Sequence, residues 1–197
     1  MAILDVPHIK QAGETHCGVA CLEMVYRFFG ITDVSQEDIW KKRKTLRPDK
    51  SAYYMETKNM VSDVKDRGFY VLRGQLYLDE GKCSESLQNL LASGIPVIAC
   101  NQWERNPEYG HFVVIVGLGG GQVMYLDPEK NEQVQKKEVK SFISEWQPTS
   151  GGEVIGGEFI VIGNEKERFK IHNLYLTNFW VPAKLKFFYL DSIDFTD

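Results

Sequence analysis

The 197-residue chain lacks any apolar run of about 18 residues, so we expect no segment that spans a membrane. It also lacks a basic excess: 23 Lys and Arg stand against 27 Asp and Glu, and the resulting net charge of −4 argues against a nucleic-acid partner. The N-terminus has neither a basic region nor a long apolar stretch, so no signal peptide is expected. These absences favour an ordinary globular domain, alone or with an appendage.

Cysteine is scarce, with residues at positions 17, 21, 83 and 100. Four cysteines in a chain of this length do not make a disulfide framework, and they indicate a reducing, cytoplasmic location. Cys17 and Cys21 would project from one helical face, but no CxxC or paired His–Cys spacing accompanies them, so we expect no metal and no cofactor. Cys21, Cys83 and Cys100 are interpreted as inert, mostly core residues.

Hydrophobic periodicity predicts a helical first half and a sheet-rich second half. The firmest helix is 17–29, where apolar residues follow a helical period and Gly30 ends the run. Loops are expected over 45–54 and 101–110. Further helices are expected over residues 36–44, 57–67, 83–93 and 139–146, and strands over residues 69–78, 95–100, 111–118, 122–126 and 158–162. Residues 3–6 are expected to form a short edge strand or an extended lead-in.

The pattern divides the chain into a compact unit, residues 1–163, and a C-terminal extension, residues 164–197. The extension is aromatic and apolar between Leu174 and Tyr189, which is too hydrophobic for a disordered tail. We expect it to pack back on the domain or to dock on a protein partner.

Cys17 stands at the start of the firmest helix, where free backbone N–H groups and the helix dipole favour a thiolate. Gly18 removes side-chain bulk beside the sulfur, which would let a substrate backbone approach. Gln11, six residues before Cys17, could place its side-chain amide beside the sulfur and donate to a developing oxyanion. This is one half of a nucleophilic site, and it needs a base from elsewhere in the chain.

His111 is the best candidate for that base among the four histidines, because it begins a strongly apolar strand. Asp127 ends the strand that returns from Gly119-Gly-Gly121. In such a hairpin the two residues come out roughly opposite each other, within side-chain reach. The carboxylate would then fix the imidazole tautomer and stabilise the imidazolium formed with Cys17. Trp103 and Tyr109, just before His111, either wall a substrate groove or pack within their loop.

Three segments matter here: Gln11 to Leu22, which contains Cys-Gly-Val-Ala-Cys-Leu, then His111-Phe-Val-Val, and Leu126-Asp-Pro. Together they resemble the papain-like cysteine peptidases that process bacteriocin leaders, the double-glycine leader peptidases. The resemblance covers about residues 3–163. It implies a papain-like α+β fold, in which an N-terminal helical half carrying the cysteine packs against an antiparallel half-barrel carrying His and Asp. It further implies that Cys17 is the nucleophile, His111 the general base and acid, Asp127 the orienting residue and Gln11 the oxyanion donor.

Three departures set this sequence apart from the exporter-linked members of that family. His16 occupies a position that is usually acidic or Asn, and we interpret it as a surface or cleft-rim group. No transmembrane or ATPase module follows, and the segment after Ile162 has no counterpart. We therefore expect a free-standing relative, whose peptide or protein substrate need not be a double-glycine leader.

The leading hypothesis is a cysteine peptidase that hydrolyses a peptide bond. The same residues could instead transfer the acyl group to an amine or deamidate a glutamine. A hypothesis of another class is a non-catalytic module that keeps the groove to bind a peptide. The complete set of Cys, His, Asp and Gln argues against the binding module, because binding alone needs no nucleophile.

Overall fold

The computed structural model describes residues 3–131, 134–179 and 185–190. The helices are α1 (Cys17–Phe28), α2 (Gln36–Arg43), α3 (Thr57–Asp66), α4 (Glu80–Ala92), α5 (Val139–Glu145) and α6 (Arg168–Phe179), with a 3-10 turn η1 over Glu165–Glu167. The strands are β1 (Thr45–Leu46), β2 (Tyr53–Tyr54), β3 (Tyr70–Leu76), β4 (Val97–Trp103), β5 (Asn106–Gly119), β6 (Gln122–Leu126), β7 (Gln135–Glu138), β8 (Glu158–Gly163) and β9 (Leu185–Leu190).

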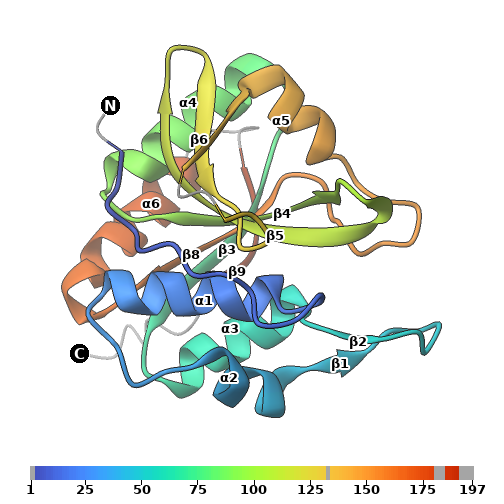
Figure 1. Ribbon diagram of the computed structural model, residues 1–197. Coiled ribbons are helices and arrows are strands. Elements are labelled where there is room, and N and C mark those ends of the chain that lie inside the picture. Colours follow the sequence, from blue (N-terminus) through green and yellow to red (C-terminus); the bar gives the residue numbers. More distant parts are fainter. Residues whose placement is uncertain (1–2, 132–133, 180–184, 191–197) are drawn as a thin grey trace.

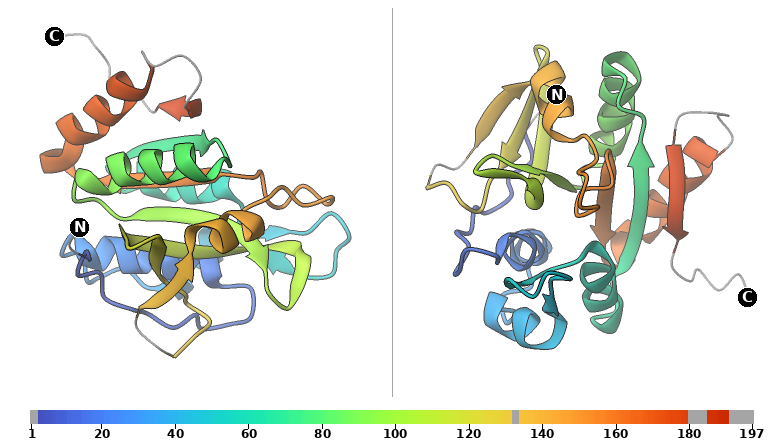
Figure 2. Two further views of the ribbon diagram at one scale, coloured as in Figure 1. Left: turned by 90° about the horizontal axis from the view of Figure 1, so that it is seen from above. Right: turned by 90° about the vertical axis from the view of Figure 1, so that its right-hand side faces the viewer.

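A seven-stranded antiparallel sheet forms the centre of the protein, in the order β7-β6-β5-β4-β8-β3-β9. Helices α1, α2 and α3 and the short β1–β2 hairpin form a second layer beside it (Figure 1). Helices α1 and α4 lie on opposite faces of the sheet (Figure 2). The combination of helices and an antiparallel sheet confirms the predicted α+β class.

Helix α1 anchors the helical layer on the sheet. Its apolar residues recur every three or four positions, and Val19, Leu22 and Val25 are completely buried. The helix ends where Gly30 adopts a φ of 82°, a left-handed conformation that glycine takes without strain. A Cβ added to Gly18 would lie 2.9 Å from Met55 Cγ. Gly18 is thus required for close packing, a role the sequence did not reveal.

Helix α2 begins as its sequence predicts. Ser35 has an extended backbone, and its side chain accepts the Asp38 N–H. The acidic residues Glu37 and Asp38 occupy the first turn, while Lys41, Lys42 and Arg43 occupy the last, which matches the direction of the helix dipole.

Several local expectations were wrong. Residues 45–54 contain the β1–β2 hairpin, and strand β5 begins at Asn106, inside the expected 101–110 loop. Both segments are polar, so tertiary pairing and not hydrophobic alternation makes them strands. Of the two arrangements expected for residues 3–6, the edge strand is not observed: these residues lead into the domain without joining the sheet, and Leu4 donates its N–H to the Val116 oxygen at 2.9 Å.

The described part of the C-terminal extension, residues 164–179 and 185–190, lies at the sheet edge away from β7. Strand β9 pairs antiparallel with β3, and α6 contacts both β3 and β8. In Figure 2 both elements lie on the far side of β3 from α1. Within the described residues, the extension therefore adds to the sheet. No helix in this described part of the chain is long and apolar enough to cross a membrane.

Gly18→Ala tests the packing of α1. The added methyl group would meet Met55 and Phe112, so we expect unfolding free energy to fall by about 1–3 kcal/mol, measured by denaturant titration. Gly81→Ala in α4 is the matched control, because the nearest atom to its added Cβ is Asp79 Oδ1 at 3.6 Å. That variant should gain about 0.5–1 kcal/mol from the better helix former. Equal effects in the two variants would contradict the packing role.

Candidate active site

Cys17 is the first residue of α1 and is 8% exposed. The preceding His16 provides no side-chain cap, so the N–H groups of the first turn keep their capacity to bind an anion or a developing oxyanion. The His16 ring instead stacks on Trp40 of α2, with ring centroids 4.0 Å apart. Burial lowers the pKa of His16, against the effect of Glu37.

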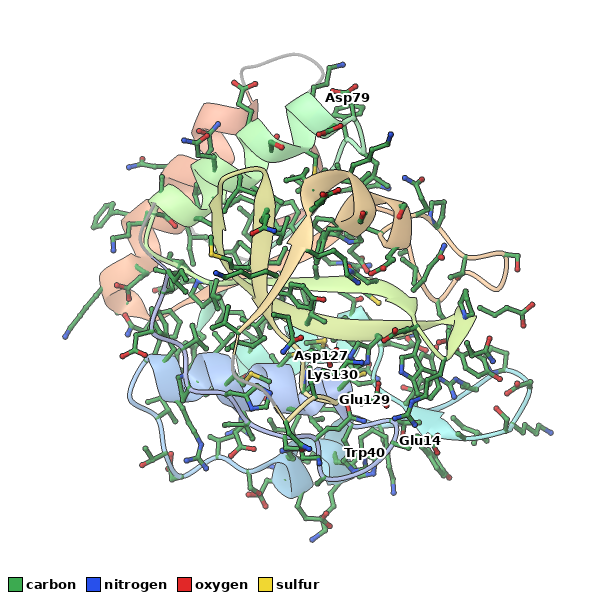
Figure 3. The ribbon with its side chains drawn as sticks, turned by 45° about the horizontal axis from the view of Figure 1, so that its top comes forward. Glu14, Trp40, Asp79, Asp127, Glu129 and Lys130 are labelled. Atoms are coloured by element: carbon green, nitrogen blue, oxygen red, sulfur yellow. The ribbon has the colours of Figure 1, made fainter. Side chains whose placement is uncertain are left out.

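His111 and Asp127 form a buried pair between β5 and the end of β6. His111 Nε2 lies 2.7 Å from Asp127 Oδ1, and the two residues are 8% and 7% exposed. The same carboxylate oxygen accepts the Glu129 N–H at 2.9 Å. Figure 3 shows Asp127 and Glu129 at the boundary between the sheet and α1.

The strand register differs from the expected one. Val114 pairs with Leu126, so continuing the register by one residue places Asp127 opposite Val113 and diagonal to His111. The turn causes the difference, because it contains only Gly120 and Gly121, both with positive φ. The irregularity of the ladder between residues 115 and 117 then moves the register back by one residue. Diagonal neighbours still lie within reach of long side chains, which is why the pair forms.

The segment before Cys17 is tied to the strand end that carries Asp127. Gln11 donates its backbone N–H to the Pro128 oxygen at 2.8 Å, and His8 Nε2 donates to the Asp127 carbonyl oxygen at 2.9 Å. These two bonds fix the lead-in to α1 relative to the His–Asp pair. The helical half and the sheet half are thereby aligned at the cysteine.

The charges around His111 favour an imidazolium. Burial lowers the pKa of His111, but hydrogen bonds with Asp127 and Cys17 outweigh it and raise that pKa to about 10. Burial raises the pKa of Asp127, but the hydrogen bond from His111 lowers it by more, so the pKa of the Asp127 carboxyl lies below its usual range. Because Nε2 is committed to Asp127, Nδ1 is the ring nitrogen left for the cysteine sulfur.

Gln11 lies on the segment that leads to the cysteine. Its Nε2 donates to the Glu14 carbonyl oxygen at 2.9 Å, which leaves one N–H of the amide for another acceptor. Its Oε1 is buried without a hydrogen-bond partner among the described residues. Gln11 is not among the described residues that line the cleft next to Cys17.

Cys17 and His111 line a cleft of about 630 Å³. Its walls come from the start of α1 and the segment before it, the β1–β2 hairpin, the start of α3, strands β3 to β5, and the segment that leads into β8. Trp103 and Tyr109 are part of this lining, which agrees with the interpretation that they wall a groove. The charged residues of the lining are Glu14, Arg47, Asp49, Glu56, Lys58, Arg73, Glu108, His111, Glu153 and Glu158.

The remaining cysteines differ from Cys17 in their surroundings. Cys21 is completely buried, and burial raises the pKa of its thiol well above the ordinary value. Burial has the same effect on the pKa of Cys100, and it raises the pKa of Cys83 to about 12. All four cysteines are free thiols. Within the described residues, no group of three or more His, Cys, Asp or Glu side chains is arranged to hold a metal ion.

Sequence reasoning missed three residues near the pair. Arg47 and Glu153 line the cleft as an ion pair, although their positions are distant in the chain and lie in stretches without a motif. Asn101 pairs directly with His111 across β4 and β5, is 5% exposed, and its Oδ1 has no hydrogen-bond partner in the described part of the chain. The only signal for Asn101 in the sequence is that it directly follows the apolar run 95–100.

Comparison with known proteins places the fold. No curated protein sequence matches the chain. Among solved structures, a C39-like peptidase from Bacillus anthracis matches with a TM-score of 0.61 at 18% identity, covering 83% of this chain and 97% of the other. The peptidase domain of Streptococcus ComA, a bifunctional ABC transporter involved in a quorum-sensing pathway, matches with a TM-score of 0.58 at 16% identity, covering 80% and 98%.

A third structure, a double-glycine motif protease from an AMS/PCAT transporter in complex with the leader peptide, matches with a TM-score of 0.54 at 20% identity, covering 82% of this chain and 93% of the other. At these identities the likeness concerns the fold, which confirms the papain-like α+β prediction. The model of the Peptidase_C39 like family matches residues 3–154, most of the chain. The chain therefore belongs to the Peptidase_C39 like family.

Proposed function

We propose that the protein is a cysteine peptidase in which Cys17 is the nucleophile, His111 the general base and acid, Asp127 the orienting carboxylate and Gln11 an oxyanion donor. The observation that carries the proposal is the buried His111–Asp127 hydrogen bond of 2.7 Å. This bond commits Nε2 to the carboxylate. Against the effect of burial, the hydrogen bonds with Asp127 and then with Cys17 raise the pKa of His111.

The proposed reaction has two stages. The Cys17 thiolate attacks the scissile carbonyl carbon, and the oxyanion that forms is held by the Cys17 backbone N–H and the free N–H of the Gln11 amide. The imidazolium of His111 then donates its proton to the leaving amine as the C–N bond breaks. Water, deprotonated by the neutral imidazole, attacks the acyl-enzyme, and the thiolate leaves.

We propose a precursor or leader peptide as the substrate. The cleft is lined by segments of both the helical half and the sheet half, and its volume suits several residues of an extended chain. One structural relative is described as bound to a leader peptide, which supports this class of substrate. The four free thiols favour a reducing, cytoplasmic setting, in which Cys17 stays active.

We further propose that residues 1–163 form the peptidase domain and that residues 164–197 are an accessory extension. Among the residues that the structure describes, those that line the cleft fall between Glu14 and Glu158, and strand β9 pairs with β3 at the sheet edge. On this proposal the extension supports the sheet and does not contribute to the reaction.

Cys17→Ala should abolish turnover and leave the fold intact, because the thiolate is the only group that forms the acyl-enzyme. Cleavage of a peptide library, with products identified by mass spectrometry, measures turnover, and circular dichroism measures the fold. In the wild type, iodoacetamide at mildly acidic pH should label Cys17 before the other three cysteines. Full cleavage by the variant, or uniformly slow labelling of the wild type, would refute the assignment.

Asp127→Asn tests the orienting role. The variant removes the charge that stabilises the imidazolium, so kcat/KM should fall roughly 10²- to 10⁴-fold. The alkaline limb of the pH profile should also move to lower pH, because the pKa of His111 falls. In the wild type the pKa of His111 is raised, so the protonated His111 stabilises the fold fully below pH 6.5, and this stabilisation is lost as the pH approaches about 10. In the variant this stabilisation should be smaller, and its loss should be complete at lower pH.

Asp63→Asn is the matched control for that experiment. Asp63 is also a buried carboxylate, 2% exposed, but it binds Tyr26 and Arg67 in the helical layer. The control should lower stability and leave the pH profile of kcat/KM unchanged. An unshifted alkaline limb in Asp127→Asn, or an equal shift in both variants, would contradict the proposal.

Gln11→Ala should lower kcat roughly 10²- to 10³-fold with a small change in KM, because the lost donor acts on the oxyanion and not on the bound substrate. Steady-state kinetics on the best-cleaved library peptide measures both constants. Gln36→Ala is the control, since Gln36 binds the backbone of Lys10 and Ala12 in the same lead-in segment. If the Gln11 variant retains wild-type kcat, the oxyanion role is wrong.

A further inference from the structure

A buried ion pair joins the two walls of the cleft. Arg47, in the turn between β1 and β2, directs Nε to Oε1 of Glu153 at 2.8 Å and Nη2 to Oε2 at 3.4 Å. Glu153 lies between α5 and β8, so the pair links the helical half to the sheet half. The two side chains are only 9% and 13% exposed. Both residues line the cleft that holds Cys17 and His111.

The carboxylate of Glu153 also binds the backbone beside His111. Its Oε2 accepts the Gly110 N–H at 3.0 Å. Gly110 pairs with Gln102, the last position before the β4–β5 ladder becomes irregular. A Cβ on Gly110 would lie 2.8 Å from the Cys100 sulfur, so this backbone is closely packed. Glu153 thus supplies a fixed, charged acceptor where regular strand pairing ends, one residue before the proposed base.

Arg47 contacts Tyr109, the residue before Gly110. Its guanidinium lies 3.9 Å from the centroid of the Tyr109 ring and 5.4 Å from that of Tyr54, which are cation–π distances. The turn that carries Arg47 is closed by its N–H bond to the Ala52 oxygen at 2.9 Å. The ion pair therefore contacts two successive residues of β5, Tyr109 through Arg47 and Gly110 through Glu153.

Burying two charges costs desolvation energy that their attraction repays only when the geometry is good. An apolar contact could join the same two segments with a smaller desolvation cost. A fixed carboxylate on the Gly110 N–H and a planar guanidinium on Tyr109 set position and direction, which an apolar contact would not.

We propose that the Arg47–Glu153 ion pair is a positioning element that sets the backbone before His111 and thereby aligns the imidazole with Cys17. This inference rests on the proposed function, in which His111 is the base. Neither residue of the pair takes part in bond making. When the pair is broken, the imidazole shifts relative to the sulfur, and the thiolate–imidazolium pair weakens.

Glu153→Gln tests the inference, because it removes the charge and retains the size of the side chain. We expect kcat on the best-cleaved library peptide to fall roughly 10- to 100-fold, as a displaced catalytic group predicts. KM should stay within about threefold. Iodoacetamide labelling of Cys17 should slow at mildly acidic pH, so the acid limb of the curve of labelling rate against pH should move to higher pH. Arg47→Lys, which keeps the charge and loses the planar fork, should show the same changes to a smaller extent.

Glu158→Gln is the matched control. Glu158 also lines the cleft and also forms a buried pair, with Arg73, but its other oxygen accepts the Thr57 hydroxyl. The control should lose thermal stability and keep the wild-type pH profile of Cys17 labelling. A structural role alone would instead make Glu153→Gln and Glu158→Gln lose stability together without a shift in either profile.

The outcomes separate this inference from the proposed function. An active wild type whose labelling profile is unchanged in Glu153→Gln and Arg47→Lys would overturn the positioning role and leave the peptidase proposal standing. A wild type without cleavage or selective Cys17 labelling would overturn the peptidase proposal and the inference with it. If Glu153→Gln does not fold, Arg47→Lys decides, and a wild-type profile in that variant counts against the inference.

Discussion

The hydrogen bond between His111 Nε2 and Asp127 Oδ1 is the constraint on which the proposed site depends. It forms between two strands whose pairing is set by a two-glycine turn and a ladder irregularity near Val116. A register shift of one residue would turn Asp127 to the other face of the sheet and separate the pair. The geometry of a distant turn thus determines whether an imidazole and a carboxylate meet.

The cysteine belongs to a different layer and must be aligned with that pair. Two bonds achieve this: the Gln11 N–H binds the Pro128 oxygen, and His8 binds the Asp127 carbonyl oxygen. The packing of α1 on β5, which needs a glycine at position 18, adds a second constraint. Charge completes the arrangement, because the raised pKa of His111 and the lowered pKa of Asp127 favour an imidazolium facing the sulfur.

Family membership and local detail carry different information about this protein. The family model and the structural relatives establish a papain-like fold, although identities are at most 20% among the relatives described. Near Cys17 this chain has the ion pair of Arg47 and Glu153, which lines the cleft, and the stacking of His16 on Trp40, which lies outside the cleft lining. A fold shared at this level supports a reaction class, and the substrate depends on the residues of the cleft.

The sequence by itself determined the elements with strong local signals: the amphipathic helix α1 with Gly30 at its end, the cap of α2 at Ser35, and the apolar strands flanking Gly119–Gly121. It also grouped Cys17, His111, Asp127 and Gln11 as one candidate site, because spacing within short segments and resemblance to a family can both be recognised in the sequence. Only the tertiary structure decided the β1–β2 hairpin, the diagonal His–Asp register, the packing role of Gly18, the addition of β9 to β3, and the ion pair of residues 47 and 153. These features depend on contacts between residues far apart in the chain, and such contacts leave no periodic pattern in any one stretch of sequence.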